Sequence, residues 1–233
     1  MTENFYLTEN PRHTVELSLD DGRVITGERF AALESFAKVV QVEDAPMIVG
    51  AVLDGSLREL TYKMERDGRG SFITMADEDG ARIYRRSLTF LLEVAFKRCF
   101  GEGKLTIDHS VSSGGYYCHV ENVPEFGAES LVALETLMRE MVEADLPFVR
   151  ETVPLEEAVA YFKQSGEDDK VRLLKYRNRP DLVLYSLGDI RDYHHGYMVP
   201  STRYLKWFAL EWVGDAFIMH FPRRHYPSGL SKM

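Results

Sequence analysis

Apolar residues in the first third of the chain come in short runs separated by turn residues, a pattern typical of β-strands. Residues 14–19 alternate apolar and polar side chains and lead into Asp20-Asp21-Gly22, which predicts a hairpin. Residues 48–53 and 71–75 predict further strands. Between them, residues 28–40 place apolar side chains at helical spacing. The pattern therefore predicts two strands, one helix and then more strands.

Helical spacing dominates the region after residue 85. Apolar residues from Leu88 to Cys99 fall on one stripe, which ends at Gly101. Further helices are predicted over residues 131–141 with Ser130 as the N-cap, over residues 155–164 behind Pro154, and around Lys170. Strands are predicted at residues 105–108, 116–120, 148–152, 182–185, 204–211 and 216–221. We expect these strands to complete one sheet that carries two or three helices.

The fold class predicted from this order is α+β. Residues 1–78 have the strand and helix order of a β-grasp domain, and residues 79–233 form a second, α+β domain. The acidic turn Asp77-Glu78-Asp79-Gly80 between them is interpreted as a solvated connector.

Composition narrows the function classes. Of the 233 residues, 45% are hydrophobic and 28% are charged, which suits a globular protein, and the formal net charge is -9. Such a charge disfavours a broad nucleic-acid surface. The basic run Lys170–Arg179 is interpreted as a solvated helix face rather than a binding stripe.

Cellular location follows from three features of the sequence. No apolar run approaches the ~20 residues that span a bilayer, so no membrane partner is expected. The N-terminal residues Met1–Phe5 show no signal-peptide pattern. Cys99 and Cys118 are expected to be buried, reduced thiols. These features predict a cytoplasmic protein.

The helix after residue 85 presents Arg86 and Phe90 on one face, because positions i and i+4 share a helix face. Arginine cannot ligate zinc or act as a base near neutral pH, but its planar fork binds carboxylate or phosphate. Placed at a helix start, Arg86 would gain from the helix dipole in binding an anion. The alternative is that Arg85 and Arg86 form ordinary salt bridges there.

Histidines gather at two places. His194 and His195 are adjacent in an extended segment, so their side chains point to opposite faces and one of them is expected to face a pocket. His109 and His119 flank a Ser/Gly-rich turn, residues 112–115, and the pair Tyr116-Tyr117. Nothing in the spacing indicates a metal, so no metal site is predicted.

Together these segments resemble the editing pocket of threonyl-tRNA synthetases, and the first strands resemble their TGS domain. In that family a helix carries HxxxH and a later loop carries Cys and His around Gly and Val-Pro. The four positions are occupied here by Arg86, Phe90, His194 and Met198. The resemblance also implies that Lys170 is the pocket lysine, Asp192 the pocket aspartate, and Gly115-Tyr116-Tyr117 a pocket strand. It implies a retained scaffold with altered chemistry.

A second resemblance is to bacterial uridine-kinase-like proteins, which carry this unit in front of a P-loop kinase. It rests on Tyr84–Leu88, on the region of His109-Ser110 and Tyr116-Tyr117, on Gly196–Thr202 and on Gly214–Pro222, with Arg203 where glycine is expected. The chain itself has no GxxxxGK[ST] motif, so it cannot transfer phosphate alone. No cofactor is expected here, and ATP and Mg²⁺ only with a downstream kinase domain.

Three functions follow as hypotheses. The first is a non-catalytic region of a uridine-kinase-like protein that binds a small anion, a nucleotide or an amino acid. Its pocket would be lined by Arg86, His109, Tyr116, Tyr117, Lys170, Asp192, His194 and His195. The alternative is a hydrolase of misacylated tRNA, with His194 as base, Asp192 orienting it and Lys170 holding the carbonyl or a phosphate; the net charge disfavours tRNA. The third is a TGS-based interaction module.

Overall fold

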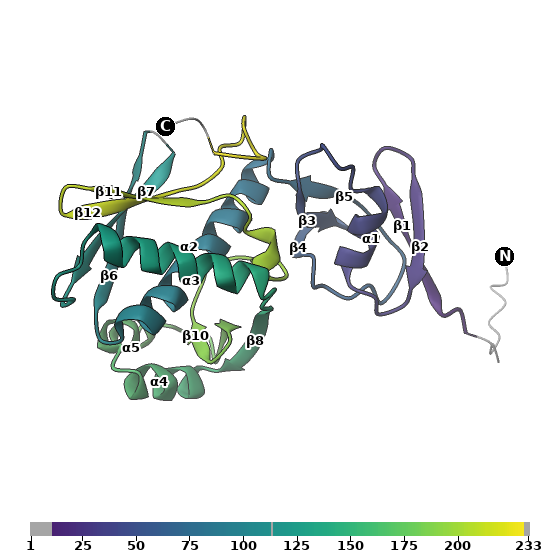
Figure 1. Cartoon of the computed structure of the whole chain (residues 1–233). Helices are drawn as coiled ribbons and strands as arrows, with labels where there is room; N and C mark the ends of the chain where they lie inside the picture. Colours follow the sequence, from purple (N-terminus) through teal and green to yellow (C-terminus); the bar gives the residue numbers. More distant parts are fainter. Residues whose placement is uncertain (1–10, 113, 231–233) are drawn as a thin grey trace, which may run out of the picture.

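The computed structural model describes residues 11–112 and 114–230 (Figure 1). Residues 1–10, Ser113 and residues 231–233 lie outside the described residues. Two predictions fall on them in whole or in part: the absence of a signal peptide at Met1–Phe5, and the turn at residues 112–115, which contains Ser113. The predicted α+β class is confirmed: helices and three β-sheets alternate along the chain. A small N-terminal part lies beside a larger part, and α2 runs from their junction into the larger one (Figure 1).

The N-terminal part is a five-stranded sheet with one helix. Its elements are β1 (Thr14–Leu19), β2 (Val24–Glu28), α1 (Leu33–Val40), β3 (Ile48–Leu53), β4 (Ser56–Glu59) and β5 (Gly68–Thr74). The strand order is β2-β1-β5-β3-β4, with β1 and β5 parallel. Leu33, Phe36 and Ala37 of α1 pack onto the apolar side chains of the sheet. The predicted element order is confirmed, while the division of the chain at residue 78 stays a prediction.

Two details of this part differ from the sequence analysis. The helix begins at Leu33 rather than at residue 28, because residues 24–28 pair with β1 and give their backbone hydrogen bonds to the sheet. Strand β4 was not predicted; its four residues are all only partly buried, so no apolar run marks it.

Helix α2 (Glu78–Phe100) is longer than predicted and begins one residue after Asp77. The acidic turn interpreted as a solvated connector is therefore the first turn of the helix. Gly80 is required there, since a Cβ at this position would lie 1.9 Å from the carbonyl oxygen of Thr74. Arg86 consequently lies in the third turn, and the prediction that it gains from the helix N-terminus is wrong.

The larger part contains two sheets instead of the single sheet predicted. One has the order β11-β12-β7-β6, from β6 (Lys104–Val111), β7 (Gly115–Glu121), β11 (Ala209–Val213) and β12 (Ala216–His220). The other has the order β10-β9-β8, from β8 (Phe148–Pro154), β9 (Asp181–Leu187) and β10 (Ile190–Asp192). Both pack with α2 in one core: Phe217 comes from the first sheet and Tyr185 from the second. Burial against a shared helix explains why both sets of strands are apolar.

Three helices complete the larger part, namely α3 (Ala128–Glu143), α4 (Leu155–Gln164) and α5 (Asp168–Leu174). Gly127 is the N-cap of α3, and Ser130 lies three residues inside the helix, where its hydroxyl accepts a 3.5 Å hydrogen bond from the Gly127 N–H. The strand predicted from residue 204 begins at residue 209, behind a 3₁₀ turn, η1 (Thr202–Tyr204).

Two tyrosines join the two parts of the molecule. The Tyr185 hydroxyl lies 2.6 Å from Glu59 Oε2, and the Tyr204 hydroxyl lies 2.8 Å from Glu34 Oε1. Both cysteines are free, but only Cys118 is buried, so the prediction that Cys99 is buried is wrong. Among the described residues no helix is long and apolar enough to cross a membrane.

Candidate functional site

Three potential donor side chains from distant parts of the chain meet inside the larger part. Glu93 comes from the middle of α2, Asp192 from the end of β10, and His194 from the loop that follows β10. One donor atom of each lies within 4.8 Å of the others. His194 Nε2 and Glu93 Oε2 are 3.7 Å apart. We call these three residues the inner cluster.

Lys170 holds Asp192 in the inner cluster. Its ammonium group lies 2.6 Å from Asp192 Oδ2 and also pairs with Glu167. The other oxygen of Asp192 accepts a 2.6 Å hydrogen bond from the Tyr193 N–H. Burial opposes the charge on Lys170, but Asp192 and Glu167 outweigh burial and raise the pKa of Lys170. The structure therefore brings together three of the predicted residues: Lys170, Asp192 and His194.

Burial keeps the other two groups of the inner cluster neutral. It raises the pKa of Glu93 to about 8, and the negative charge of Asp192 acts in the same direction. It lowers the pKa of His194 to about 4, assisted by the positive charges of Lys170 and Arg86. Near pH 7 a neutral carboxyl group therefore faces a neutral imidazole.

Two atoms of the inner cluster have no hydrogen-bond partner. Glu93 Oε2 and His194 Nε2 are both sealed from solvent, and neither has a partner in the described part of the chain. Leaving a buried polar atom unsatisfied costs about 1–3 kcal/mol. Such atoms are few in native proteins and concentrate at functional places. The pair therefore marks this point as a candidate site.

Arg86 serves the loop beside the inner cluster. Its Nη1 donates a 2.6 Å hydrogen bond to the Tyr197 carbonyl oxygen. A Cβ at residue 196, where the backbone φ is +99°, would lie 2.8 Å from the guanidinium carbon, so glycine is needed there. Phe90 lies with its ring 4.8 Å from the His194 ring, and Met198 is buried in the core. Arg86 thus contacts the backbone of the loop, and in this structure it is not an open anion site.

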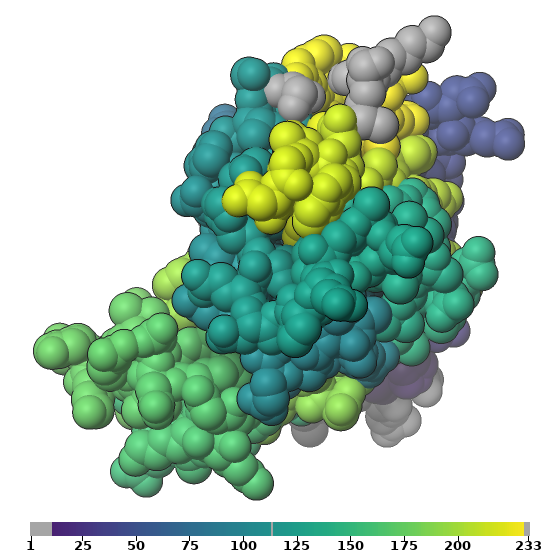
Figure 2. All heavy atoms as spheres, turned by 60° about the vertical axis from the view of Figure 1, so that its left-hand side comes forward, coloured from purple at the N-terminus to yellow at the C-terminus, as the bar shows by residue number. Residues whose placement is uncertain are grey.

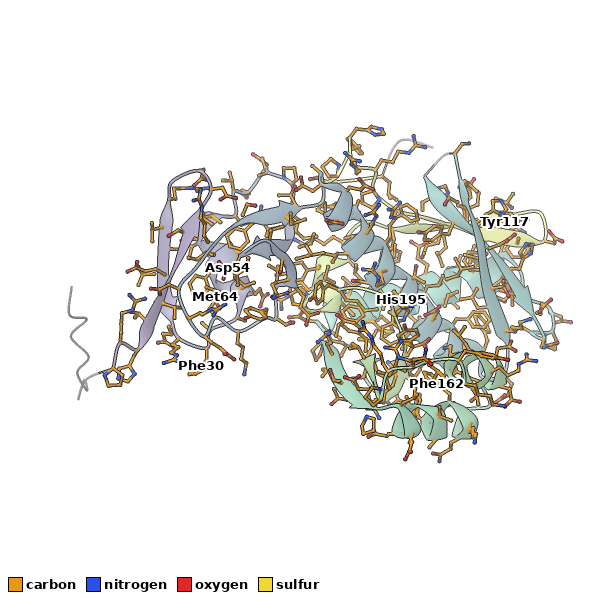
Figure 3. All side chains as sticks on the ribbon, turned by 180° about the vertical axis from the view of Figure 1, so that it is seen from behind. Phe30, Asp54, Met64, Tyr117, Phe162 and His195 are labelled. Carbon is orange, nitrogen blue, oxygen red and sulfur yellow. The ribbon has the colours of Figure 1, made fainter. Side chains whose placement is uncertain are left out.

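His109 and Tyr117 lie elsewhere, and the expectation that these two residues line the pocket is wrong. Alternation along β7 turns Tyr116 inward, against Phe221, and Tyr117 outward. His109 stacks on Tyr117, whose other neighbour is His119. In Figure 3 Tyr117 lies far from His195.

The adjacent histidines behave as predicted, one inward and one outward. The His194 side chain is 13% exposed and faces Glu93. His195 is exposed, and its ring lies 4.7 Å from that of Tyr193. Only His194 therefore belongs to the inner cluster.

A cleft of about 760 Å³ opens beside His194. Its lining, which we call the basic cleft, comprises Arg150, Arg177, Asn178, Arg179, Val183, Tyr193, His194, His195, Gly196 and Tyr197. Among the described residues the lining contains no Asp or Glu. Arg177 and Arg179 follow α5, so this end of the basic run is not the solvated helix face that was predicted. In Figure 2 the α4–α5 segment, in light green, projects as a lobe from the surface.

A second hollow, of about 450 Å³, is also lined in part by the inner cluster. Glu93, Lys170 and Asp192 belong to its lining, and His194 does not. The inner cluster therefore contributes side chains to both hollows.

Glu93 was missed in the sequence analysis. It is the one charged residue in the stretch Phe90-Leu91-Leu92-Glu93-Val94-Ala95, and the other five are buried. A charge inside such a run is the signal that could have identified it.

Comparison with known proteins supports part of this picture. No protein-family model matches the chain. The chain is 36% identical over 174 residues to "Threonine--tRNA ligase" of Polaromonas sp., covering 74% of this chain and 27% of that protein. It is 31% identical over 204 residues to the Clostridium kluyveri protein of the same name, covering 87% and 32%. A Methylococcus capsulatus threonine–tRNA ligase is 32% identical over 202 residues, covering 86% and 32%.

The chain thus spans about a third of the length of the curated relatives it matches. The predicted resemblance to a segment of threonyl-tRNA synthetases is confirmed. The predicted uridine-kinase-like parent has no support among these relatives.

Proposed function

We propose that this chain hydrolyses the ester that joins an amino acid to the 3′ end of a tRNA. The relatives named above are ligases for threonine and tRNA, and this chain matches one segment of them. The observation that carries the proposal is the position of the inner cluster at the wall of the basic cleft, with His194 common to both. Phosphate groups and an ester carbonyl are the two features that these surfaces would recognise together.

The basic cleft suits the phosphate and base groups of a nucleic-acid end. Arg150 and Arg179 form no ion pair with any described residue, so both guanidinium groups are available to phosphate. Arg150 lies over the Tyr197 ring, and Arg177 lies over the Tyr193 ring. Guanidinium and aromatic faces in one cleft bind unpaired nucleotides by stacking and by charge. The net charge of -9 confines such binding to this local surface.

The inner cluster and Lys170 together supply the groups that ester hydrolysis needs. Neutral His194 takes a proton from the attacking water while the new carbon–oxygen bond forms. The ammonium of Lys170 stabilises the negative charge on the carbonyl oxygen, and Asp192 holds Lys170 in place. The bond to the ribose oxygen then breaks as that oxygen takes the proton from His194. These roles are those of the hydrolase hypothesis. The structure adds Glu93, whose carboxyl group lies 3.7 Å from His194 Nε2.

A deacylation assay tests the proposal. Purified chain is mixed with seryl-tRNA or threonyl-tRNA, and release of the amino acid is followed against the spontaneous rate. We expect release from at least one of them, and a loss of about 100-fold or more in His194→Ala, since general acid–base groups contribute about 10²–10⁴-fold. His195→Ala is the matched control for a change of histidine in the same loop.

Two results would contradict the proposal. One is an absence of release above the spontaneous rate with either substrate. The other is an equal loss in His194→Ala and His195→Ala, which would place the effect in the loop rather than in the inner cluster.

The second candidate function is recognition of a small anion, a nucleotide or an amino acid, without chemistry. The observation that favours it is again the basic cleft, which needs no reaction to explain its arginines. A nucleotide that raises the melting temperature of the chain, and does so less in Arg150→Ala and Arg179→Ala, would support it. A downstream uridine-kinase-like domain has no support among the relatives and stays a prediction, as does a role of residues 1–78 in binding a partner.

A further inference from the structure

We propose that Glu93, Asp192 and His194 form a binding site for one divalent transition-metal ion of the zinc class. The sequence predicts no metal site, because the spacing of its histidines does not indicate one and Arg86 cannot ligate zinc. The structure offers a different set of donors, one imidazole nitrogen and two carboxylate groups, drawn from α2, β10 and the loop after β10.

The spacing of the donors fits such an ion. Zinc takes imidazole nitrogen at about 2.0–2.1 Å and carboxylate oxygen at about 2.0–2.2 Å, so tetrahedral donors lie about 3.4 Å apart. His194 Nε2 and Glu93 Oε2 are 3.7 Å apart, and the whole donor set lies within 4.8 Å. Small side-chain shifts would bring the donors to the required distances.

The two unsatisfied atoms point to a missing partner between them. Glu93 Oε2 and His194 Nε2 are the atoms that face each other across 3.7 Å, and both are sealed from solvent. Neither contacts Lys170, whose ammonium is bound by Asp192 and Glu167. A cation between the two atoms satisfies both of them at once.

The charges in direct contact with the site also favour a dication. A bound cation would displace the proton of Glu93, so that Glu93, Asp192 and Glu167 carry three negative charges and Lys170 carries one positive charge. The surplus of two negative charges is what a divalent ion neutralises. Asp192 can still act as a ligand, because a carboxylate offers about four lone-pair sites and two of them are used by Lys170 and the Tyr193 N–H.

The donor types narrow the choice of ion. Imidazole suits Zn²⁺, Fe²⁺ and Ni²⁺, while Mg²⁺ and Ca²⁺ prefer oxygen donors alone. Three protein ligands leave a coordination position open, as in catalytic zinc sites. The site is therefore expected to bind Zn²⁺ more tightly than Mn²⁺ and to exclude Mg²⁺, and Co²⁺ can replace Zn²⁺ as a spectroscopic probe.

Direct binding measurements test the site without any RNA. Full-length chain, freed of any histidine tag, is stripped with a chelator and titrated by calorimetry with Zn²⁺, Co²⁺, Mn²⁺ and Mg²⁺. We expect about one Zn²⁺ per chain, visible absorption from bound Co²⁺, and no binding of Mg²⁺. Glu93→Gln and His194→Ala should each weaken Zn²⁺ binding at least tenfold.

Matched controls separate this site from other donors. His195→Ala changes the adjacent exposed histidine, and Glu102→Gln changes another carboxylate of the same hollow as Glu93, so both should bind as the unchanged protein does. Circular dichroism checks that each variant is folded, and Glu93→Gln decides the matter if His194→Ala does not fold. Absence of stoichiometric binding, or binding that survives Glu93→Gln, would overturn the site.

Metal binding and ester hydrolysis fail independently. A chain that binds Zn²⁺ and releases no amino acid keeps this site and loses the proposed function. A chain that hydrolyses the ester but shows no stoichiometric Zn²⁺ binding keeps the proposed function and loses this site.

Discussion

Two regions of the larger part combine histidine with acidic and aromatic side chains, yet they differ in every physical respect. The inner cluster joins Glu93, Asp192 and His194 beside the Phe90 ring. The outer row, on β6 and β7, consists of Asp108, His109, Tyr117 and His119. His109 Nδ1 lies 3.0 Å from Asp108 Oδ2, a shorter contact than any histidine contact in the inner cluster.

The two regions differ in their exposure to solvent. The His109 side chain is 60% exposed, whereas that of His194 is 13% exposed. Water can reach the polar atoms of the outer row, so its close contacts leave no buried group without a partner. In the inner cluster the same residue types carry unsatisfied atoms and altered protonation. Short distances between titratable groups therefore do not identify a functional site. Buried polar atoms that lack a hydrogen-bond partner do.

The largest expected difference between the regions concerns their aromatic side chains. Phe90 is fully buried between the rings of His194 and Phe148. Phe90→Ala should lower the free energy of unfolding by about 3–5 kcal/mol, because it leaves a cavity in the core. Tyr117→Ala, in the outer row, should cost no more than about 1 kcal/mol. Urea unfolding followed by circular dichroism measures both.

Phe90→Leu checks the interpretation of that result. It retains most of the buried volume and should recover more than half of the loss. Equal effects of Phe90→Ala and Tyr117→Ala would show that the inner cluster is not held by core packing.

A lysine pair gives the next comparison. Lys170 is 36% exposed and its partner Asp192 is 13% exposed. Lys170→Met removes the only ammonium that contacts Asp192 and Glu167 among the described residues, so these carboxylates face each other without compensation. The unfolding free energy should fall by about 2 kcal/mol, less than for a fully buried pair because solvent reaches Lys170.

Lys104→Met is the control for that change. Lys104 pairs with Glu121 at 2.9 Å on the outer sheet, where both side chains are more than half exposed. The free energy of unfolding of Lys104→Met should equal that of the unchanged protein within the error of the experiment. A loss as large as that of Lys170→Met would contradict the argument that burial, and not pairing, makes Lys170 matter.

Much of the fold could be predicted from the sequence, because apolar spacing records burial. The strands over residues 14–19 and 48–53 and the helical stripe after residue 85 all follow from it. The spacing of apolar residues does not show which other strand a given strand pairs with. Both sheets of the larger part pack with α2, so their strands show the same pattern of apolar residues. That pattern alone predicts one sheet instead of two.

The site was predicted less completely, for a related reason. The meeting of Lys170, Asp192 and His194 came from a resemblance to known sequences rather than from spacing. Arg86 was expected to bind an anion, but its partner is a backbone carbonyl 111 residues away, which no local pattern reveals. Tyr117 was misplaced although period-two alternation with Tyr116 puts the two on opposite faces. That alternation was available from the sequence and was not applied.

The smallest expected effect is a gain in stability from removing a functional group. Glu93→Leu, studied with a chelator present, should raise the free energy of unfolding by about 1 kcal/mol at pH 7, because it removes a buried carboxyl oxygen that has no hydrogen-bond partner among the described residues. The effect is modest since 37% of the Glu93 side chain is exposed. A site that costs stability in this way is typical of function.

The stability gain of Glu93→Leu should depend on pH, and the raised pKa of Glu93 gives the direction of that dependence. Burial raises the pKa of Glu93 from 4.5 to about 8, so the folded chain favours protonated Glu93, and this contribution to stability is lost as the pH rises from about 4.5 to about 8. The advantage of Glu93→Leu should therefore grow from pH 5 to pH 8. His194 is present in both proteins, so its own opposite effect at lower pH largely cancels in the difference. Glu121→Leu should show no such trend, because Lys104 lowers the pKa of Glu121 and keeps it ionised throughout this range. An advantage that stays flat with pH would mean that Glu93 titrates like Glu121, and the contrast between the inner cluster and the exposed sheet would not extend to its carboxylates.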